Sequence, residues 1–131
     1  FIAGRACYIY AAAQNDQKKA TLEARGATVI YLPNSQGKVD LKAMLHDLAH
    51  RGVNELHVEA GNRLNGSFVR EGLVDEMLVY LAPKMLGTGR GLTNMGPFEA
   101  ISEGLDLTFT STDRVGPDLR IVARVPGRDS F

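Results

Sequence analysis

Short apolar runs alternate with amphipathic stretches along most of this chain. Runs that are rich in β-branched and aromatic residues are typical of strands. On that basis we predict strands at residues 6–12, 27–32, 55–60, 74–82, 105–110 and 118–125. The second half of the run at 74–82 is apolar on consecutive residues, which predicts that neighbouring elements cover both faces of that strand.

The stretches between the first four runs carry the start and stop signals of helices. A polar capping residue stands at the start of the first two, Asn15 or Asp16 for one and Asp40 for the other. Glycine follows where each of these helices should end, because it readily adopts the left-handed turn that terminates a helix. The predicted helices span residues 16–25, 41–51 and 63–71.

The order of these elements predicts an α/β fold. Four strands separated by three helices indicate βαβ units, and therefore a mostly parallel sheet flanked by helices. The last two strands have only a turn at Gly116-Pro117 between them, so we expect a C-terminal antiparallel hairpin at one edge of the sheet. A length of 131 residues corresponds to one domain.

Composition and charge narrow the range of partners. Lysine plus arginine equals aspartate plus glutamate, with 15 residues of each kind. This balance gives no indication of nucleic acid or of an acidic membrane surface as a partner. Apolar runs are far shorter than the roughly 20 residues of a membrane-spanning helix. The single cysteine, Cys7, lies in an apolar run and is interpreted as a small core residue; it is compatible with a reducing compartment such as the cytoplasm.

The segment from Gly61 to Ser67 is the strongest candidate for binding chemistry. It follows the predicted strand at 55–60 and opens a helix. Ligands of open α/β sheets bind beyond the carboxyl ends of the strands, and the first turn of a helix offers free N–H groups and a positive dipole end to a phosphate. The residues alone leave two interpretations open, a cradle for a diphosphate or a tight strand-to-helix turn.

A carboxylate, three histidines and a glycine-rich stretch are further candidates for binding chemistry. Glu59 ends an apolar strand and is either a ligand-binding carboxylate or a solvated strand end. His57 lies two residues before it and is interpreted as a core or edge histidine. His46 and His50 have the spacing of metal ligands on one helix, but they lie on a polar face and are interpreted as solvated. The glycine-rich stretch 87–91 does not join a strand to a helix and is interpreted as a mobile loop.

Four motifs follow one another between residues 55 and 118. They are Val58-Glu59-Ala60-Gly61, Gly72-Leu73-Val74-Asp75-Glu76, Ala82-Pro83-Lys84-Met85-Leu86-Gly87 and Val115-Gly116-Pro117-Asp118. In this order they resemble the reductase domain of the riboflavin-pathway deaminase–reductases. The resemblance covers nearly the whole chain. It also implies that the family domain is longer on its N-terminal side, so residues 1–131 are expected to be a reductase domain that lacks its N-terminal part.

The resemblance implies a fold similar to dihydrofolate reductase and a hydride transfer from NADPH. The implied substrate is a pyrimidine ribosylamine phosphate, 5-amino-6-(5-phosphoribosylamino)uracil, which is reduced to its ribitylamino product. By the same resemblance Glu59 is expected to contact the substrate, and a cytoplasmic homodimer is expected, with the strand at 74–82 and its neighbours at the interface. The residues expected to bind NADPH are Gly61, Asn62, Arg63, Leu64, Asn65, Gly66 and Ser67.

Two other interpretations remain at this point. The chain could be a non-catalytic nucleotide-binding module of the same fold, or an inactive structural fragment held together by dimer contacts. No catalytic residue and no metal ligand is assigned. Arg63 and Arg90 are the candidates for contacting the 2′-phosphate of NADPH.

Overall fold

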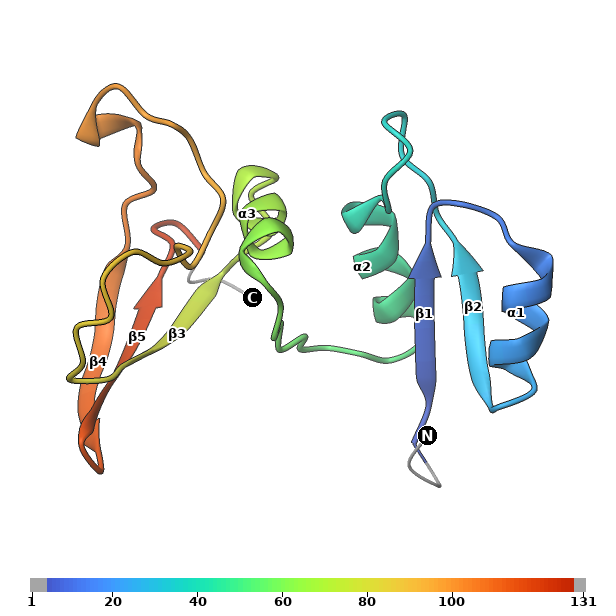
Figure 1. The fold of residues 1–131 in the computed structure, drawn as a ribbon, viewed down its shortest axis with the longest axis horizontal. Coiled ribbons are helices and arrows are strands. Elements are labelled where there is room, and N and C mark those ends of the chain that lie inside the picture. Colours follow the sequence, from blue (N-terminus) through green and yellow to red (C-terminus); the bar gives the residue numbers. More distant parts are fainter. Residues whose placement is uncertain (1–4, 129–131) are drawn as a thin grey trace. The chain divides into compact units, whose positions relative to one another are not determined.

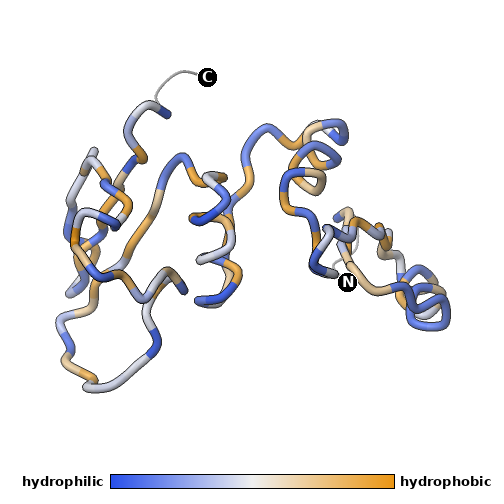
Figure 2. The backbone as a smooth tube through the Cα atoms, turned by 90° about the horizontal axis from the view of Figure 1, so that it is seen from above, coloured by the Kyte–Doolittle hydropathy of each residue, from blue (hydrophilic) through white to orange (hydrophobic). Residues whose placement is uncertain are grey.

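The structure is a computed structural model that describes residues 5–128. Backbone contacts divide the chain into two compact units, Phe1–His57 and Val58–Phe131. Their helices and strands are labelled in Figure 1. Hydrophobic and hydrophilic stretches alternate along both units, as the sequence pattern indicates (Figure 2).

The first unit is a parallel strand pair flanked by two helices. Its elements are β1 (Cys7–Ala11), α1 (Asp16–Glu23), β2 (Ala27–Tyr31) and α2 (Leu41–His50). β1 and β2 pair in parallel, with α1 beside β2 and α2 on the other side, next to β1 (Figure 1). The most buried apolar side chains of this unit are Ala27, Val29 and Leu41.

Local signals place both helices of the first unit as predicted. The Asn15 side chain accepts a hydrogen bond from the Lys18 backbone N–H at 2.9 Å. The Asp40 side chain accepts one from the Ala43 N–H at the same distance. Gly26 follows α1 with a φ of +88°, in the left-handed region that favours glycine. The predicted caps and the glycine stop are therefore confirmed.

A side-chain cluster ties β1 to α2. Tyr10 Oη donates a hydrogen bond to Asp47 Oδ2 at 2.7 Å, and Arg51 Nε donates to the same oxygen at 2.7 Å. The Arg51 guanidinium lies 4.5 Å from the centroid of the Tyr8 ring. Burial and the hydrogen bond to Asp47 raise the pKa of Tyr10 to about 12. Hydrogen bonds from Arg51 and Tyr10 lower the pKa of Asp47.

The second unit contains an antiparallel sheet. α3 (Asn62–Arg70) precedes β3 (Glu76–Leu81), a short 3-10 turn η1 (Ile101–Glu103), β4 (Thr108–Val115) and β5 (Asp118–Arg124). The strand order is β3-β5-β4, with both pairs antiparallel. β4 and β5 form the predicted hairpin through Gly116-Pro117, although β4 begins at Thr108 and not at residue 105. Phe68 and Ala123 are the buried apolar side chains of this unit.

The predicted strand at 55–60 is absent from the described residues, and the predicted α/β fold with a mostly parallel sheet is confirmed only in part. Parallel pairing among residues 5–128 is confined to β1 and β2. The segment 55–60 forms no strand ladder, and its apolar residues Leu56 and Val58 are exposed. An alternating pattern gives a segment the side chains of a strand, but a strand also needs a neighbour for its backbone hydrogen bonds.

β3 differs from prediction in both its direction and its environment. It was expected to be a parallel strand covered on both faces, but it pairs antiparallel with β5. Leu78, Tyr80 and Leu81 are exposed. A consecutive apolar run does not specify the partner, and here a hairpin strand adjacent in the sheet supplies the hydrogen bonds.

The structure also bears on the burial of Cys7 and on the expectation about membrane-spanning helices. Cys7 is half-buried in β1, so its interpretation as a core residue holds only in part. Within the described residues, no helix combines the length and the apolar character needed to cross a membrane.

Candidate functional site

The N-terminus of α3 presents unpaired backbone donors. Gly61 caps the helix in extended backbone (φ −82°, ψ 166°) and no side chain forms a capping hydrogen bond to it within the described residues. In α3 the N–H groups of Leu64 and Asn65 both donate to the Gly61 carbonyl at 3.1 Å, so the N–H groups before Leu64 are the ones without a carbonyl partner in the helix, and they lie at the positive end of the helix dipole. The described first turn of α3 also carries no acidic side chain. This end of the helix is therefore suited to an anion.

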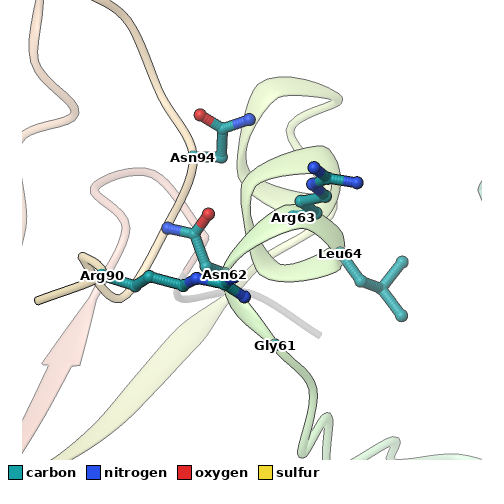
Figure 3. A pocket seen from close by; sticks show the side chains of 6 residues that line it. All are labelled: Gly61, Asn62, Arg63, Leu64, Arg90 and Asn94. Atoms are coloured by element: carbon teal, nitrogen blue, oxygen red, sulfur yellow. The ribbon is translucent and has the colours of Figure 1, made fainter.

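An open cleft lies at this helix end. It has a volume of about 570 Å³. The residues that line it come from the start of α3 and from the loop after β3 (Figure 3), and they are Gly61, Asn62, Arg63, Leu64, Arg90 and Asn94. Two of these described residues are arginines and none is a carboxylate, so the lining carries positive charge.

Gly61 faces open space in this cleft. A Cβ atom built on Gly61 would meet no atom within 4 Å. The backbone at the start of α3 is therefore accessible to a ligand, because no side chain of its own or of a neighbour covers it. A glycine at this position lets a ligand approach the backbone closely.

The loop that carries Arg90 is attached to α3 by asparagine side chains. Asn62 Nδ2 donates to the Gly91 carbonyl at 2.8 Å, and the Asn94 N–H donates to the Asn62 carbonyl at 2.9 Å. Asn65 Nδ2 donates to the Leu92 carbonyl at 3.2 Å. Sequence reasoning missed this attachment because the partners are separated by almost 30 residues and no local pattern links them.

Gly66 allows the backbone of this loop to pack closely against the helix. It is buried, and a Cβ atom at this position would lie 2.4 Å from the Asn94 carbonyl oxygen and 2.7 Å from the Asn94 nitrogen. The loop backbone therefore occupies the space where any other side chain would begin. Arg70 strengthens the same contact through a hydrogen bond to the Asn94 carbonyl.

The predicted cofactor-binding residues divide into two groups in the structure. Gly61, Asn62, Arg63 and Leu64 line the cleft. The other three lie one turn further along α3. Asn65 and Gly66 contact the loop, and the Ser67 hydroxyl donates to the Arg63 carbonyl at 3.2 Å within the helix.

The remaining predicted residues lie outside the cleft lining. Glu59 and His57 are exposed in the extended segment before α3. His46 and His50 are exposed on α2, which agrees with the solvated face expected for them. Among residues 5–128, histidine, cysteine and carboxylate side chains form no group of three that could hold a metal ion.

Comparison with known proteins shows what the chain as a whole is similar to. Residues 4–121 match the family described as the RibD C-terminal domain. The chain is 36% identical over 91 residues to the riboflavin biosynthesis protein RibD of Escherichia coli (strain K12), a match that covers 69% of this chain and 25% of that protein. It is 32% identical over 119 residues to RibD of Bacillus amyloliquefaciens, covering 88% of this chain and 32% of that protein.

A third relative is shorter and is named for one activity. It is the 5-amino-6-(5-phosphoribosylamino)uracil reductase of Buchnera aphidicola subsp. Acyrthosiphon pisum (strain APS), 29% identical over 99 residues. That match covers 75% of this chain and 48% of that protein. The chain thus spans between a quarter and a half of the length of these relatives.

Solved structures show the same fold. RibD of Acinetobacter baumannii, form 2, superposes with a TM-score of 0.75 at 24% sequence identity, covering 89% of this chain and 30% of that one. A pyrimidine reductase-like protein of Corynebacterium diphtheriae superposes with a TM-score of 0.67 at 21% identity, covering 90% of this chain and 48% of that one.

Proposed function

This chain belongs to the family of RibD C-terminal domains, and from that premise we propose that it is the reductase part of an NADPH-dependent enzyme of riboflavin biosynthesis. The proposed reaction converts 5-amino-6-(5-phosphoribosylamino)uracil to 5-amino-6-(5-phosphoribitylamino)uracil. The name of the Buchnera relative supports this substrate. The observation that carries the proposal for this chain is the positively charged cleft at the start of α3, where the backbone of Gly61 is uncovered.

The cleft suits the phosphates of a dinucleotide. The N-terminal N–H groups of α3 can donate hydrogen bonds to phosphate oxygens, and the absence of a Cβ at Gly61 leaves room for close approach. Asn62, Arg63 and Leu64 complete the wall of the cleft on the helix side. NADPH, when bound, supplies the hydride, and the residues of the chain bind and orient it.

Asn65, Gly66 and Ser67 belong to the same proposed cofactor segment but act one step away from the cleft. Asn65 and Gly66 fix the loop against the helix. Ser67 accepts a hydrogen bond from Arg70 Nη2 at 3.1 Å, and Arg70 in turn binds the Asn94 carbonyl. These contacts give the cleft a defined wall, and orientation of bound groups is the main contribution a protein makes to a hydride transfer.

Glu59 is the proposed substrate contact. Its carboxylate is exposed two residues before the helix cap, so a substrate beside the cofactor can reach it. A carboxylate accepts hydrogen bonds from hydroxyl and amine groups, and such charge-assisted bonds are about twice as strong as neutral ones. We assign Glu59 to a hydroxyl or amine of the ribosylaminopyrimidine.

We further propose a fold similar to dihydrofolate reductase and a homodimer that functions in the cytoplasm. Exposed apolar side chains on β3 support a dimer interface at or near this strand, because contiguous apolar surface commonly marks an interaction site. They are Leu78, Tyr80 and Leu81. The balanced charge of the chain gives no reason to propose nucleic acid or a membrane as a further partner.

The proposal is tested by following NADPH oxidation with the protein that contains this sequence. We expect a fall in NADPH absorbance that depends on added 5-amino-6-(5-phosphoribosylamino)uracil. Glu59→Gln should bind NADPH as the unmodified protein does, but turn over more slowly or require more substrate. NADPH binding without oxidation would favour the non-catalytic nucleotide-binding module, and Glu59→Gln kinetics equal to those of the unmodified protein would remove the substrate role of Glu59.

A further inference from the structure

We propose that Arg90, from the glycine-rich loop after β3, binds the diphosphate of the dinucleotide together with the N-terminus of α3. This inference rests on the proposed function and adds a residue outside the segment Gly61–Ser67. It gives Arg90 a role different from the 2′-phosphate contact expected from the sequence, and it gives a binding role to a loop whose glycine content predicts mobility.

The loop is held beside the helix at the positions next to Arg90. Gly91 is bound through its carbonyl to the Asn62 side chain at 2.8 Å, and Leu92 is bound to Asn65 at 3.2 Å. Asn94 is fixed by the backbone hydrogen bond to Asn62 and by the close approach to Gly66. Arg90 therefore precedes an anchored stretch of backbone, and its side chain starts from a fixed point at the cleft.

The Arg90 side chain is directed to the start of α3. It lines the cleft with Gly61 and Asn62. In Figure 3 it extends from the loop toward Asn62 at the first turn of the helix, whereas Arg63 and Leu64 project from the other side of the helix in this view. Of the two arginines, Arg90 is thus the one that faces the uncovered helix terminus.

The charges of the cleft favour an anion. Arg90 is exposed, and within residues 5–128 it forms no ion pair with a carboxylate. It lines the same cleft as the start of α3, the positive end of the helix dipole, at which negative charges are stabilising. A diphosphate would accept hydrogen bonds from both the guanidinium and the helix N–H groups, because a guanidinium matches phosphate oxygens in charge and in geometry.

We assign Arg90 to the diphosphate of the cofactor and not to its 2′-phosphate. The donors that share the cleft with Arg90 are the first backbone N–H groups of a helix, which are suited to bind phosphate groups. NADPH and NADH have the same diphosphate. Loss of Arg90 should therefore weaken the binding of both cofactors to a similar extent.

The test is titration of the protein that contains this sequence with NADPH and, separately, with NADH. The variants are Arg90→Met, Arg90→Lys and, as a matched control, Arg114→Met. Arg114 is also an exposed arginine of the second unit, but it lines a different cleft near the end of β3. We expect Arg90→Met to raise the Kd of both cofactors about tenfold. Arg90→Lys should raise it less, and Arg114→Met should leave it unchanged.

The dependence on salt gives a second measurement that a structural role would not affect. Removal of one phosphate-binding charge should make the Kd less sensitive to ionic strength in Arg90→Met than in the unmodified protein. A Kd in Arg90→Met equal to that of the unmodified protein would overturn the inference, as would a loss confined to NADPH, which would assign Arg90 to the 2′-phosphate. Failure of the unmodified protein to bind either cofactor would instead overturn the proposed function, and this inference with it.

Discussion

Two glycines of one predicted segment have different tasks at the residue scale. Gly61 faces open space at the cleft, so its small size matters to whatever enters the cleft. Gly66 faces the backbone of Asn94, so its small size matters to the packing of the loop on the helix. The sequence motif contains both residues but does not distinguish between them, and only the position of the loop does.

Replacing Gly61 with valine should weaken NADPH binding and leave the fold intact. The backbone at Gly61 is in an extended conformation that any residue adopts, and an added Cβ atom would meet no atom within 4 Å apart from those of its chain neighbours. It would fill the space in which a phosphate approaches the chain. The free energy of unfolding should fall by about 1 kcal/mol, the difference between glycine and a branched residue at a helix cap. A cofactor titration and a thermal melt measure the two effects, and an unchanged Kd would refute the phosphate assignment.

The Tyr10–Asp47 hydrogen bond should make the first unit sensitive to pH at both ends of the scale. The pKa of Tyr10 is raised from 10.0 to about 12, so its neutral form stabilises the fold fully below pH 10. This contribution is lost as the pH rises through about 12. The pKa of Asp47 is lowered, so its contribution is present above the pKa of an unfolded aspartate, about 3.9, and is lost as the pH falls below that value.

Tyr10→Phe removes the hydrogen bond and should remove the alkaline part of this dependence. We expect the free energy of unfolding at neutral pH to fall by about 1 kcal/mol. Between pH 10 and 12 the unmodified protein should lose stability more steeply than the variant. Urea unfolding at several pH values measures both effects. Tyr80→Phe is the control, because Tyr80 is exposed on β3; equal alkaline slopes for Tyr10→Phe and the unmodified protein would contradict the assignment.

At the scale of elements, the contact between α3 and the loop defines the cleft. Gly66→Ala should disturb it, because the new Cβ would stand 2.4 Å from a backbone oxygen that cannot rotate away. Alanine is the better helix former by up to about 1 kcal/mol, but overpacking costs about 1–3 kcal/mol, so we expect a net loss of stability. Gly61→Ala is the matched control in the same segment. Hydrogen exchange at the Asn94 amide, which donates to the Asn62 carbonyl, should speed up only in Gly66→Ala.

The elements also show which structural features the sequence can specify. The helix starts at Asn15 and Asp40 were predicted correctly, because a cap is an interaction between residues three apart. The hairpin at Gly116-Pro117 was predicted correctly for the same reason. β3 was assigned the wrong direction, and the segment 55–60 was assigned a strand that is absent. Strand pairing depends on partners distant in the chain, and hydrophobicity alone does not identify them.

In the candidate site too, residues with a local sequence signal were predicted, and residues brought in by distant contacts were not. Gly61–Leu64 were identified from the strand-to-helix motif and do line the cleft. Arg90 was named only as one of two candidate arginines, and Asn94 was not considered. Both belong to a loop that is bound to α3 by hydrogen bonds between Asn62 and the residues Gly91 and Asn94, about 30 positions later in the chain, a relation that no local pattern contains.

At the scale of the whole molecule, we expect the proposed reaction to need more binding groups than the candidate site itself contains. The described residues offer a carboxylate at Glu59 and a cationic cleft at α3. Hydride transfer requires cofactor and substrate at near-contact distance, and a misplacement of about 1 Å can cost about a hundredfold in rate. A substrate that carries a base, a sugar and a phosphate needs groups that hold each of these parts. The side chains that line the cleft within the second unit are those of Asn62, Arg63, Leu64, Arg90 and Asn94, and these polar groups are too few to hold a base, a sugar and a phosphate as well as the cofactor.

We therefore predict that these 131 residues, expressed by themselves, do not reduce the pyrimidine substrate at a measurable rate and that they self-associate. The second unit leaves large apolar side chains in water, with Met85 and Ile101 almost fully exposed and Phe109 at 68%. Apolar surface of this extent and the unpaired edges of a three-stranded sheet both favour association between copies. Size-exclusion chromatography with light scattering measures the association, and NADPH absorbance in the presence of substrate measures turnover. Sustained, substrate-dependent oxidation by a monomeric sample would contradict the prediction, because it would mean that Glu59, α3 and the rest of these residues suffice to hold both reactants.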